Sequence, residues 1–503
     1  MSSYILNHLV LPIFILFFLL SILGYGRLLD KYTNFYDQTL RVYNIVLIQG
    51  LFLISVSSIL INFLIPMTDF VIIIFLLIGL CFYLYFLLKV RDKKKESKFL
   101  LIITFLSFIF SYFAGVHDDY SYHISTIFNF KEKNLFQIIH ERNISYNSNW
   151  LFINAIISLS YFSSTLYILT SLLYSIFIFD IYRIYKQSLK KNFYYSGLIS
   201  YFVLIFFIGV LNNYKEHGTD IPGVIVSFYL LIILSKYKLD NVKNIEKNIL
   251  LISYFLICFA FVIKITNVLL ILFLISIISL KKILNIEIKK YFLFTILPLL
   301  WIFQNYNISG CLVWPIEITC FTNNDKAIFE TYLIESFAKG DINTTIDVEG
   351  FTWINTWLNN HINKIAETYL LFFLIFFIPI IYNYLKSLKF RKSIFSYYFS
   401  IFNSKNYFVL FLIILLTNIV WFINAPAYRF GIFYNLSLII FLLLPFWKYF
   451  FENHLYFTKK YLITMLILIS IYFSYENFTK YYWYLERYSI WPPIENNLLI
   501  SRN

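Results

Sequence analysis

The feature that most constrains this chain is a series of apolar stretches, each close to the roughly 20 residues that a helix needs to cross a membrane. Of its 503 residues, 60% are apolar and 14% are charged, whereas globular proteins have about 25% charged residues. A soluble domain has too little interior to bury this much apolar surface. We therefore predict an all-α polytopic membrane protein.

The stretches are spread over the whole chain without a Gly-, Ser- or Pro-rich linker, which predicts one transmembrane domain over residues 1–503. We expect about 12–14 transmembrane helices. The first stretch lacks a basic leader and a small-residue cleavage site, so we expect a retained helix rather than a signal peptide. The stretches lie near residues 4–25, 44–65, 69–89, 99–114, 164–182, 194–211, 221–235, 249–262, 266–280, 291–306, 366–385, 407–423, 432–447 and 461–474.

Short basic clusters between the stretches predict the orientation of the helices. The net charge of +14 is divided among these clusters instead of forming one patch, so nucleic-acid binding is not predicted. The positive-inside rule places the clusters in the cytoplasm. They are Arg91–Lys98, Arg183–Lys191, Lys236–Lys247, Lys281–Lys290 and Lys386–Lys405. Alternation of the helices then predicts four outer segments, which are residues 115–149, 212–220, 307–365 and 424–431.

Two apolar segments do not fit simple alternation. Residues 249–281 are too many for one span, and basic clusters lie at both ends, so we expect two short helices that turn near Lys264 on the outer side. Trp150–Phe162 is too short to cross easily. We expect it to form a re-entrant or interfacial helix under the outer surface.

Two of the four cysteines, Cys311 and Cys320, lie in the large outer loop. An oxidising compartment could join them in a disulfide. The sequence alone leaves open whether they are joined or are free thiols.

The first large outer loop carries an acidic motif directly after a predicted helix. Asp118, Asp119, Tyr122 and His123 lie close together, and Asn149 follows at the end of the loop. A partly desolvated carboxylate can act as a general base, so Asp118, Asp119 and His123 are predicted catalytic residues. These three could also hold a divalent cation. Tyr122 and Asn149 are predicted to bind substrate, and a solvated acidic loop without a site is the alternative.

Four further residues mark the other outer turns, and each has an ordinary explanation besides a functional one. Asp220 is expected to bind sugar hydroxyls or to orient a cation, although helix capping also accounts for it. Lys264 and Arg429 suit a phosphate group, with snorkelling and headgroup anchoring as the alternatives. Trp314 is either a sugar-stacking platform or an interfacial anchor.

Together these residues supply an acid, an imidazole, an ammonium and a guanidinium on one membrane face. This set suits a reaction with a lipid-linked phosphate donor, in which cations hold the phosphate and a carboxylate activates an acceptor hydroxyl. The sequence contains no phosphate-binding glycine loop, zinc-ligand spacing or serine-nucleophile motif. Nucleotide-driven chemistry is therefore not predicted.

At these positions the chain resembles the GT-C superfamily of integral membrane glycosyltransferases, which includes the protein O-mannosyltransferases and the aminoarabinose transferases of lipid A. The similarity is greatest to a bacterial group of such proteins. It implies a GT-C-like fold, a polyprenyl-phosphate sugar donor, an inverting single displacement and Asp118 as the base, with Asp119 as the alternative. The segments that carry it are Asp118-x-x-x-Tyr122-His123, Asn147-Ser148-Asn149-Trp150, Thr219-Asp220-Ile221-Pro222, Lys264, Trp314-Pro315 and Ala425-Pro426-x-x-Arg429-Phe430-Gly431.

We therefore predict a multi-pass glycosyltransferase of the bacterial inner membrane, with its site facing the periplasm or exterior. It would transfer a sugar from a polyprenyl-phosphate donor to a cell-envelope glycan, lipid or protein acceptor. No cofactor is required, and the divalent cation stays an open alternative. An O-antigen-type polymerase or ligase is the second hypothesis. A flippase or transporter of lipid-linked sugars is the third. Transporters need ionisable groups near the bilayer midplane, whereas the candidate charges here lie at one membrane surface.

Overall fold

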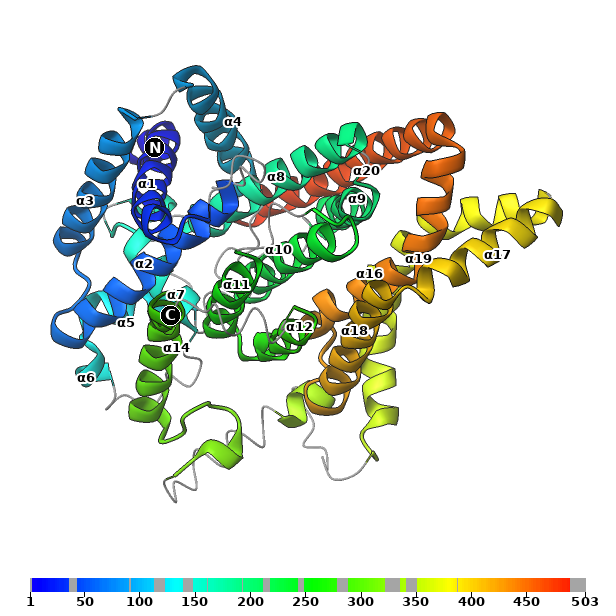
Figure 1. Ribbon diagram of the computed structural model, residues 1–503. Helices are drawn as coiled ribbons and strands as arrows, with labels where there is room; N and C mark the ends of the chain where they lie inside the picture. Colours follow the sequence, from blue (N-terminus) through cyan, green and yellow to red (C-terminus); the bar gives the residue numbers. More distant parts are fainter. Residues whose placement is uncertain are drawn as a thin grey trace.

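The computed structural model is helical throughout the part of the chain that it describes (Figure 1). Within this part, β-structure is limited to two isolated bridges. The described residues are 2–35, 43–89, 92–112, 123–138, 148–160, 162–191, 193–210, 218–242, 248–277, 288–321, 335–340, 351–386 and 388–488. The prediction of an all-α polytopic membrane protein is thus confirmed at the level of fold class.

Every predicted apolar stretch coincides with a helix. The N-terminal half contains α1 (Ser2–Thr33), α2 (Tyr43–Leu64), α3 (Asp69–Leu87), α4 (Lys93–Ser111), α5 (Ile124–Glu132), α6 (Leu135–Ile138), α7 (Asn149–Ile157), η2 (Ser163–Tyr167), α8 (Leu169–Lys191), α9 (Tyr194–Val210) and α10 (Asp220–Lys238). The C-terminal half contains α11 (Ile249–Ile263), η5 (Ile265–Ile271), α12 (Leu272–Ile275), α14 (Ile288–Ser309), η6 (Glu317–Thr319), α16 (Ile354–Lys386), α17 (Leu388–Phe402), α18 (Lys405–Asn424), η7 (Tyr428–Gly431), α19 (Ile432–Asn453) and α20 (Leu455–Tyr488).

Fewer helices than the expected 12–14 are long and apolar enough to span a membrane. Among the described residues, eight meet both conditions, or nine if the bent pair within α16 is one span. Helix α9, helix α11 and the η5–α12 pair are apolar but shorter. Helix α16 also begins at Ile354, inside the segment expected to be an outer loop. Hydropathy marks only the lipid-facing part of such a helix and misses the polar turns that precede it.

Helix α1 packs closely against α3 through small residues. A Cβ atom at Gly24 would lie 1.9 Å from the carbonyl oxygen of Gly79, so the two backbones touch. Ser21 Oγ and Tyr25 OH donate hydrogen bonds to carbonyl oxygens of α3, at 2.5 and 2.7 Å. Contacts of this kind are typical of helix pairs in membranes, where close packing replaces the hydrophobic effect.

A buried carboxylate joins three further helices. Asp180 on α8 is fully buried and forms an ion pair with Arg183 at 3.1 Å. It also accepts a hydrogen bond from the backbone N–H of Asn44 at 3.0 Å and one from Tyr229 OH on α10 at 3.3 Å. The first N–H groups of a helix have no partner within the helix, so Asp180 caps α2 from its neighbour.

The polar contacts group the connecting segments at two opposite ends of the bundle. At one end, Asn248 bonds the carbonyl oxygen of Asn34, and Asn406 bonds that of Lys238, both at 3.0 Å. At the other end, Trp357 Nε1 bonds the carbonyl oxygen of Pro426 at 2.7 Å. The predicted alternation likewise places the residues of the two asparagine contacts on the cytoplasmic side, and it places Trp357 and Pro426 on the outer side.

Helix α5 is fixed to the outer end of α3 by a buried ion pair. Lys131 Nζ lies 2.8 Å from Asp69 Oδ1, and the two side chains are 4% and 13% exposed. Lys131 also donates to the carbonyl oxygen of Ser158 at 2.9 Å, and Asp69 accepts from the backbone N–H of Ser160 at 2.9 Å. The pair therefore joins α5, α3 and the turn after α7.

We predict that Lys131→Met lowers the free energy of unfolding by about 3 kcal/mol, because Asp69 would keep a buried charge without its cation. Lys95→Ala is the matched control, since the Lys95–Asp92 pair is 73% and 45% exposed. Its loss should cost less than about 1 kcal/mol. Thermal melting followed by size-exclusion chromatography in detergent measures both, and equal melting temperatures for the two variants would contradict the assignment.

Candidate functional site

Three residues predicted from separate outer turns meet at one point. Lys264 Nζ contacts Asp220 Oδ1 in an ion pair, and Arg429 Nε lies 3.8 Å from Asp220 Oδ2. The side chains of Lys264, Asp220 and Arg429 are 13%, 26% and 48% exposed, respectively. One carboxylate thus lies between a nearly buried ammonium and a half-exposed guanidinium. We call these three residues the charged cluster.

Lys264 lies at a break between two helices. It follows the last residue of α11, has an extended backbone, and is followed by η5. Its ammonium is 3.6 Å from the ring centroid of Phe430, a cation–π contact. Tyr434 OH holds the break by donating to the carbonyl oxygen of Thr266 at 2.7 Å. The predicted turn near Lys264 is present, and its side chain is paired instead of extending to solvent, which argues against snorkelling.

The depth of Lys264 follows from the length of α11. This helix has 15 residues and is therefore about 22 Å long, shorter than a hydrocarbon core of roughly 30 Å. A helix of this length that starts at one boundary of the core ends before the other. The ammonium is also only 13% exposed, and an unpaired charge in such surroundings would be costly.

Asp220 does not act as a helix cap through its side chain. Helix α10 begins at Asp220, and Thr219 occupies the capping position without a side-chain hydrogen bond. The carboxylate of Asp220 is directed to Lys264 and Arg429 instead. A negative charge in the first turn is also favourable beside the helix dipole. Capping by Thr219 or Asp220, the ordinary explanation for this turn, is thus not what these side chains do.

Arg429 is positioned by close packing of the segment between α18 and α19. A Cβ atom at Gly431 would lie 2.3 Å from the Trp421 ring, so only glycine fits there. The hydrogen bond from Trp357 to Pro426 ties the same segment to the first turns of α16. The contact of Phe430 with Lys264 was not predicted, because neither the charge pattern nor the spacing identifies which aromatic ring lies against a cation.

Asn149 reaches the surroundings of the charged cluster through α7. Ser148 Oγ donates a hydrogen bond at 2.6 Å to the carbonyl oxygen of Ile263, the residue before Lys264. Asn149 is completely buried, and its two amide atoms have no hydrogen-bond partner among the described residues. A buried polar group without a partner is rare, and an unplaced ligand or water is one explanation. Helix α7 has nine residues, all buried, which fits the short non-spanning helix expected near Trp150.

The acidic motif is only partly described. His123 precedes α5 and is 4% exposed. Asp118, Asp119 and Tyr122 lie outside the described residues, so the choice of base stays a prediction. Among the described residues, no three His, Cys, Asp or Glu side chains are grouped in a way that could hold a metal ion.

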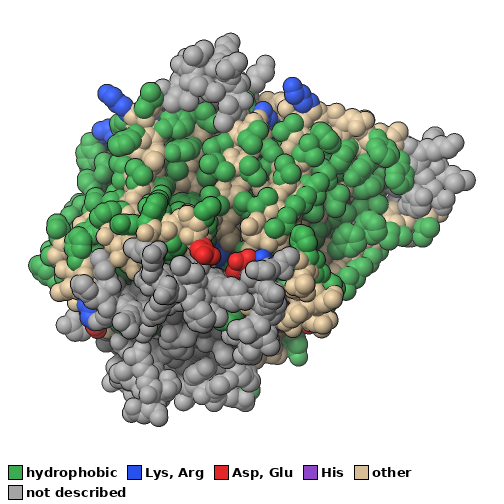
Figure 2. Space-filling view, turned by 90° about the horizontal axis from the view of Figure 1, so that it is seen from below, with side chains coloured by type: hydrophobic (Ala, Val, Ile, Leu, Met, Phe, Trp, Pro, Cys, Tyr) green, Lys and Arg blue, Asp and Glu red, His purple; other side chains and the backbone are tan. Residues whose placement is uncertain are grey.

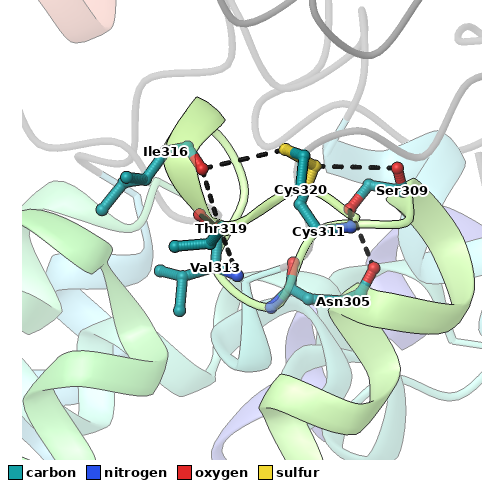
Figure 3. Close-up of a disulfide and its surroundings, with 7 residues drawn as sticks. All are labelled: Asn305, Ser309, Cys311, Val313, Ile316, Thr319 and Cys320. Atoms are coloured by element: carbon teal, nitrogen blue, oxygen red, sulfur yellow. Dashed lines mark hydrogen bonds between the residues drawn. A yellow bond between two sulfur atoms is a disulfide. The ribbon is translucent and has the colours of Figure 1, made fainter. Parts of the chain in front are cut away.

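Trp314 lies in a disulfide-closed loop after α14. Cys311 and Cys320 are joined, and Trp314 packs against them at 6% exposure. Thr319 Oγ1 donates to the carbonyl oxygen of Ile316 at 2.7 Å and accepts from the N–H of Val313 at 3.1 Å (Figure 3). A sugar-stacking platform needs an exposed ring face, which this buried ring does not offer.

The described part of the face in Figure 2 is largely apolar. Figure 2 views the molecule from below, the end at which α14 and the loop after it lie in Figure 1. Hydrophobic side chains cover much of this view, and a small group of acidic side chains, with basic ones beside it, lies near the middle. Other basic side chains lie towards the edges of the view.

Comparison with known proteins gives one match. No curated protein and no solved structure matches the chain. A family model described as a domain of unknown function, DUF8201, matches residues 8–436, which include all the predicted site residues. The chain therefore belongs to the DUF8201 family.

Proposed function

We propose that this protein is a membrane glycosyltransferase that moves a sugar from a polyprenyl-phosphate donor to a cell-envelope glycan, lipid or protein acceptor. The observation that carries the proposal is the charged cluster, in which Lys264 and Arg429 lie on either side of one carboxylate. A nearly buried ammonium and a half-exposed guanidinium side by side suit a ligand with an anionic head and a hydrocarbon tail. A phosphate-linked polyprenyl sugar has both.

The chemistry requires a base opposite the phosphate. In the proposed reaction, Asp118 accepts the proton of an acceptor hydroxyl, with Asp119 as the alternative base. The hydroxyl oxygen then forms a bond to the anomeric carbon as the bond from that carbon to the phosphate oxygen breaks. Attack opposite the leaving group inverts the configuration. Lys264 and Arg429 would stabilise the negative charge that develops on the polyprenyl phosphate.

The surrounding residues fit subsidiary roles in the same reaction. The unpartnered amide of Asn149 can donate to and accept from sugar hydroxyls, and α7 connects it to the backbone beside Lys264. His123 and Tyr122 would act near the acidic motif. A divalent cation at Asp118, Asp119 and His123 is part of the proposal only if activity proves sensitive to EDTA.

Two features support an outward-facing site in a bacterial inner membrane. The disulfide between Cys311 and Cys320 lies in a segment predicted to be outside, and disulfides persist in oxidising compartments. The charged cluster likewise joins residues from predicted outer turns. The basic clusters lie between the spans on the other side by the positive-inside rule.

We expect Asp118→Asn to abolish sugar transfer, because an amide cannot accept the proton of the acceptor. The assay is sugar release from a panel of radiolabelled undecaprenyl-phosphate sugars by purified protein in liposomes. Glu317→Gln, an exposed acid of the large outer loop, is the control and should keep wild-type activity. Full activity of folded Asp118→Asn would reject Asp118 as the base, and the same measurement on Asp119→Asn would test the alternative.

We expect Arg429→Gln to lower kcat/KM for the donor by about 10- to 100-fold, the usual effect of losing a charge-assisted hydrogen bond. Arg429→Lys should give an intermediate value, because it keeps the charge but loses the planar pair of donors. Initial rates at several donor concentrations measure both variants. Unchanged kcat/KM in Arg429→Gln would show that the guanidinium serves only as a headgroup anchor.

A further inference from the structure

Asp220 occupies the position that an anionic ligand of the two cations would take. Its Oδ1 contacts the ammonium of Lys264, and its Oδ2 faces Arg429 Nε. The two oxygens of a phosphate could bridge the same two cations. The side chain cannot be explained by capping, since α10 has no side-chain cap.

The two contacts of Asp220 differ in strength. Lys264 is nearly buried and has Phe430 on one side, so its pairing with Asp220 is close and shielded from water. Arg429 is half exposed and 3.8 Å away, near the limit for an ion pair. Exposed pairs at such distances contribute little. The guanidinium can therefore exchange its partner at small cost, while Lys264 is held in place.

We propose that Asp220 is an internal counter-ion that competes with the phosphate of the ligand for Lys264 and Arg429. In this role the carboxylate offsets one of the two positive charges when no ligand is bound, and it gives up part of its contact with the cations when a phosphate binds. The affinity for the phosphate is consequently lower than two uncompensated cations would give.

The consequence for turnover rests on the proposed function. A phosphate-linked sugar donor is a diester with one negative charge, whereas the polyprenyl phosphate left after transfer is a monoester with a charge of about −1.5 to −2 near pH 7. The product would thus be held more tightly than the donor by the same cations. A competing carboxylate favours its release.

This role differs from one of the two expected from the sequence, in which Asp220 binds sugar hydroxyls. If Asp220 bound the sugar, its removal would weaken binding of the donor. It would leave binding of a phosphate that carries no sugar unchanged. A competing counter-ion predicts tighter binding of the phosphate itself. The two roles thus give opposite results with a sugar-free probe.

The experiment measures binding of farnesyl phosphate to full-length protein in detergent by microscale thermophoresis, with farnesol as the uncharged control. We expect Asp220→Asn to bind farnesyl phosphate about tenfold more tightly than the wild type, since one nearby like charge is removed at a partly exposed site. Arg429→Gln should bind it more weakly, and farnesol should bind all variants equally. Inorganic phosphate as a further probe separates a free anion from a lipid-linked one.

Asp220→Asn leaves Lys264 without its carboxylate, which could prevent folding. A second pair of variants then tests the proposal. Lys264→Gln with Asp220→Asn removes both charges of the pair and leaves no unpaired one. Compared with Lys264→Gln alone, it should bind farnesyl phosphate more tightly, because Arg429 is then released from the carboxylate. Equal or weaker binding in both comparisons would overturn the counter-ion role. No binding by the wild type would reject the proposed donor class, and with it this inference.

Discussion

An ammonium group recessed in an apolar interior has to be paired with a carboxylate, and this requirement connects the fold to the site. Lys264 satisfies it through Asp220, so the outer ends of α10 and α11 must lie together. Phe430 covers the same ammonium and brings in the segment between α18 and α19. Removing Asp220 would leave the nearly buried ammonium without its carboxylate, at a cost of several kcal/mol.

The same requirement organises the rest of the bundle. Arg27 on α1 pairs with Glu96 on α4, and Tyr83 OH of α3 donates to that carboxylate at 3.1 Å. Asp180 joins α8, α2 and α10, as described above. These charges inside the helices all have protein partners, which gives them structural roles. The transport hypothesis, which calls for ionisable groups near the midplane, gains no support from them.

Much of the fold follows from hydropathy, because lipid imposes a strict length and polarity on each helix. All the apolar stretches became helices, and residues predicted on one side contact each other. Hydropathy could not show that α16 extends into the polar turns from Ile354 or that α17 is helical, since neither segment is apolar enough. Among the described residues eight or nine helices pass a test of both length and composition, and short helices such as α11 pass only the second.

The sequence identified which residues form the site, but not which of them contact each other. Asp220, Lys264 and Arg429 were identified singly because charge at a membrane boundary is conspicuous in an apolar sequence. Their mutual pairing depends on helix packing, which no local pattern encodes. For the same reason the sequence left Asp220 between sugar binding and the orientation of a cation, and it offered for Trp314 only exposed roles that its burial against the disulfide does not fit.

The central claim is that Lys264 and Arg429 form the phosphate site of a lipid-linked donor. A cryo-electron microscopy structure of the wild-type protein in nanodiscs with undecaprenyl phosphate tests it most directly. The account predicts phosphate density within hydrogen-bonding distance of both cations and the polyprenyl chain extending into the bilayer. Phosphate density elsewhere, with Asp220 still in contact with Lys264 and Arg429, would contradict it.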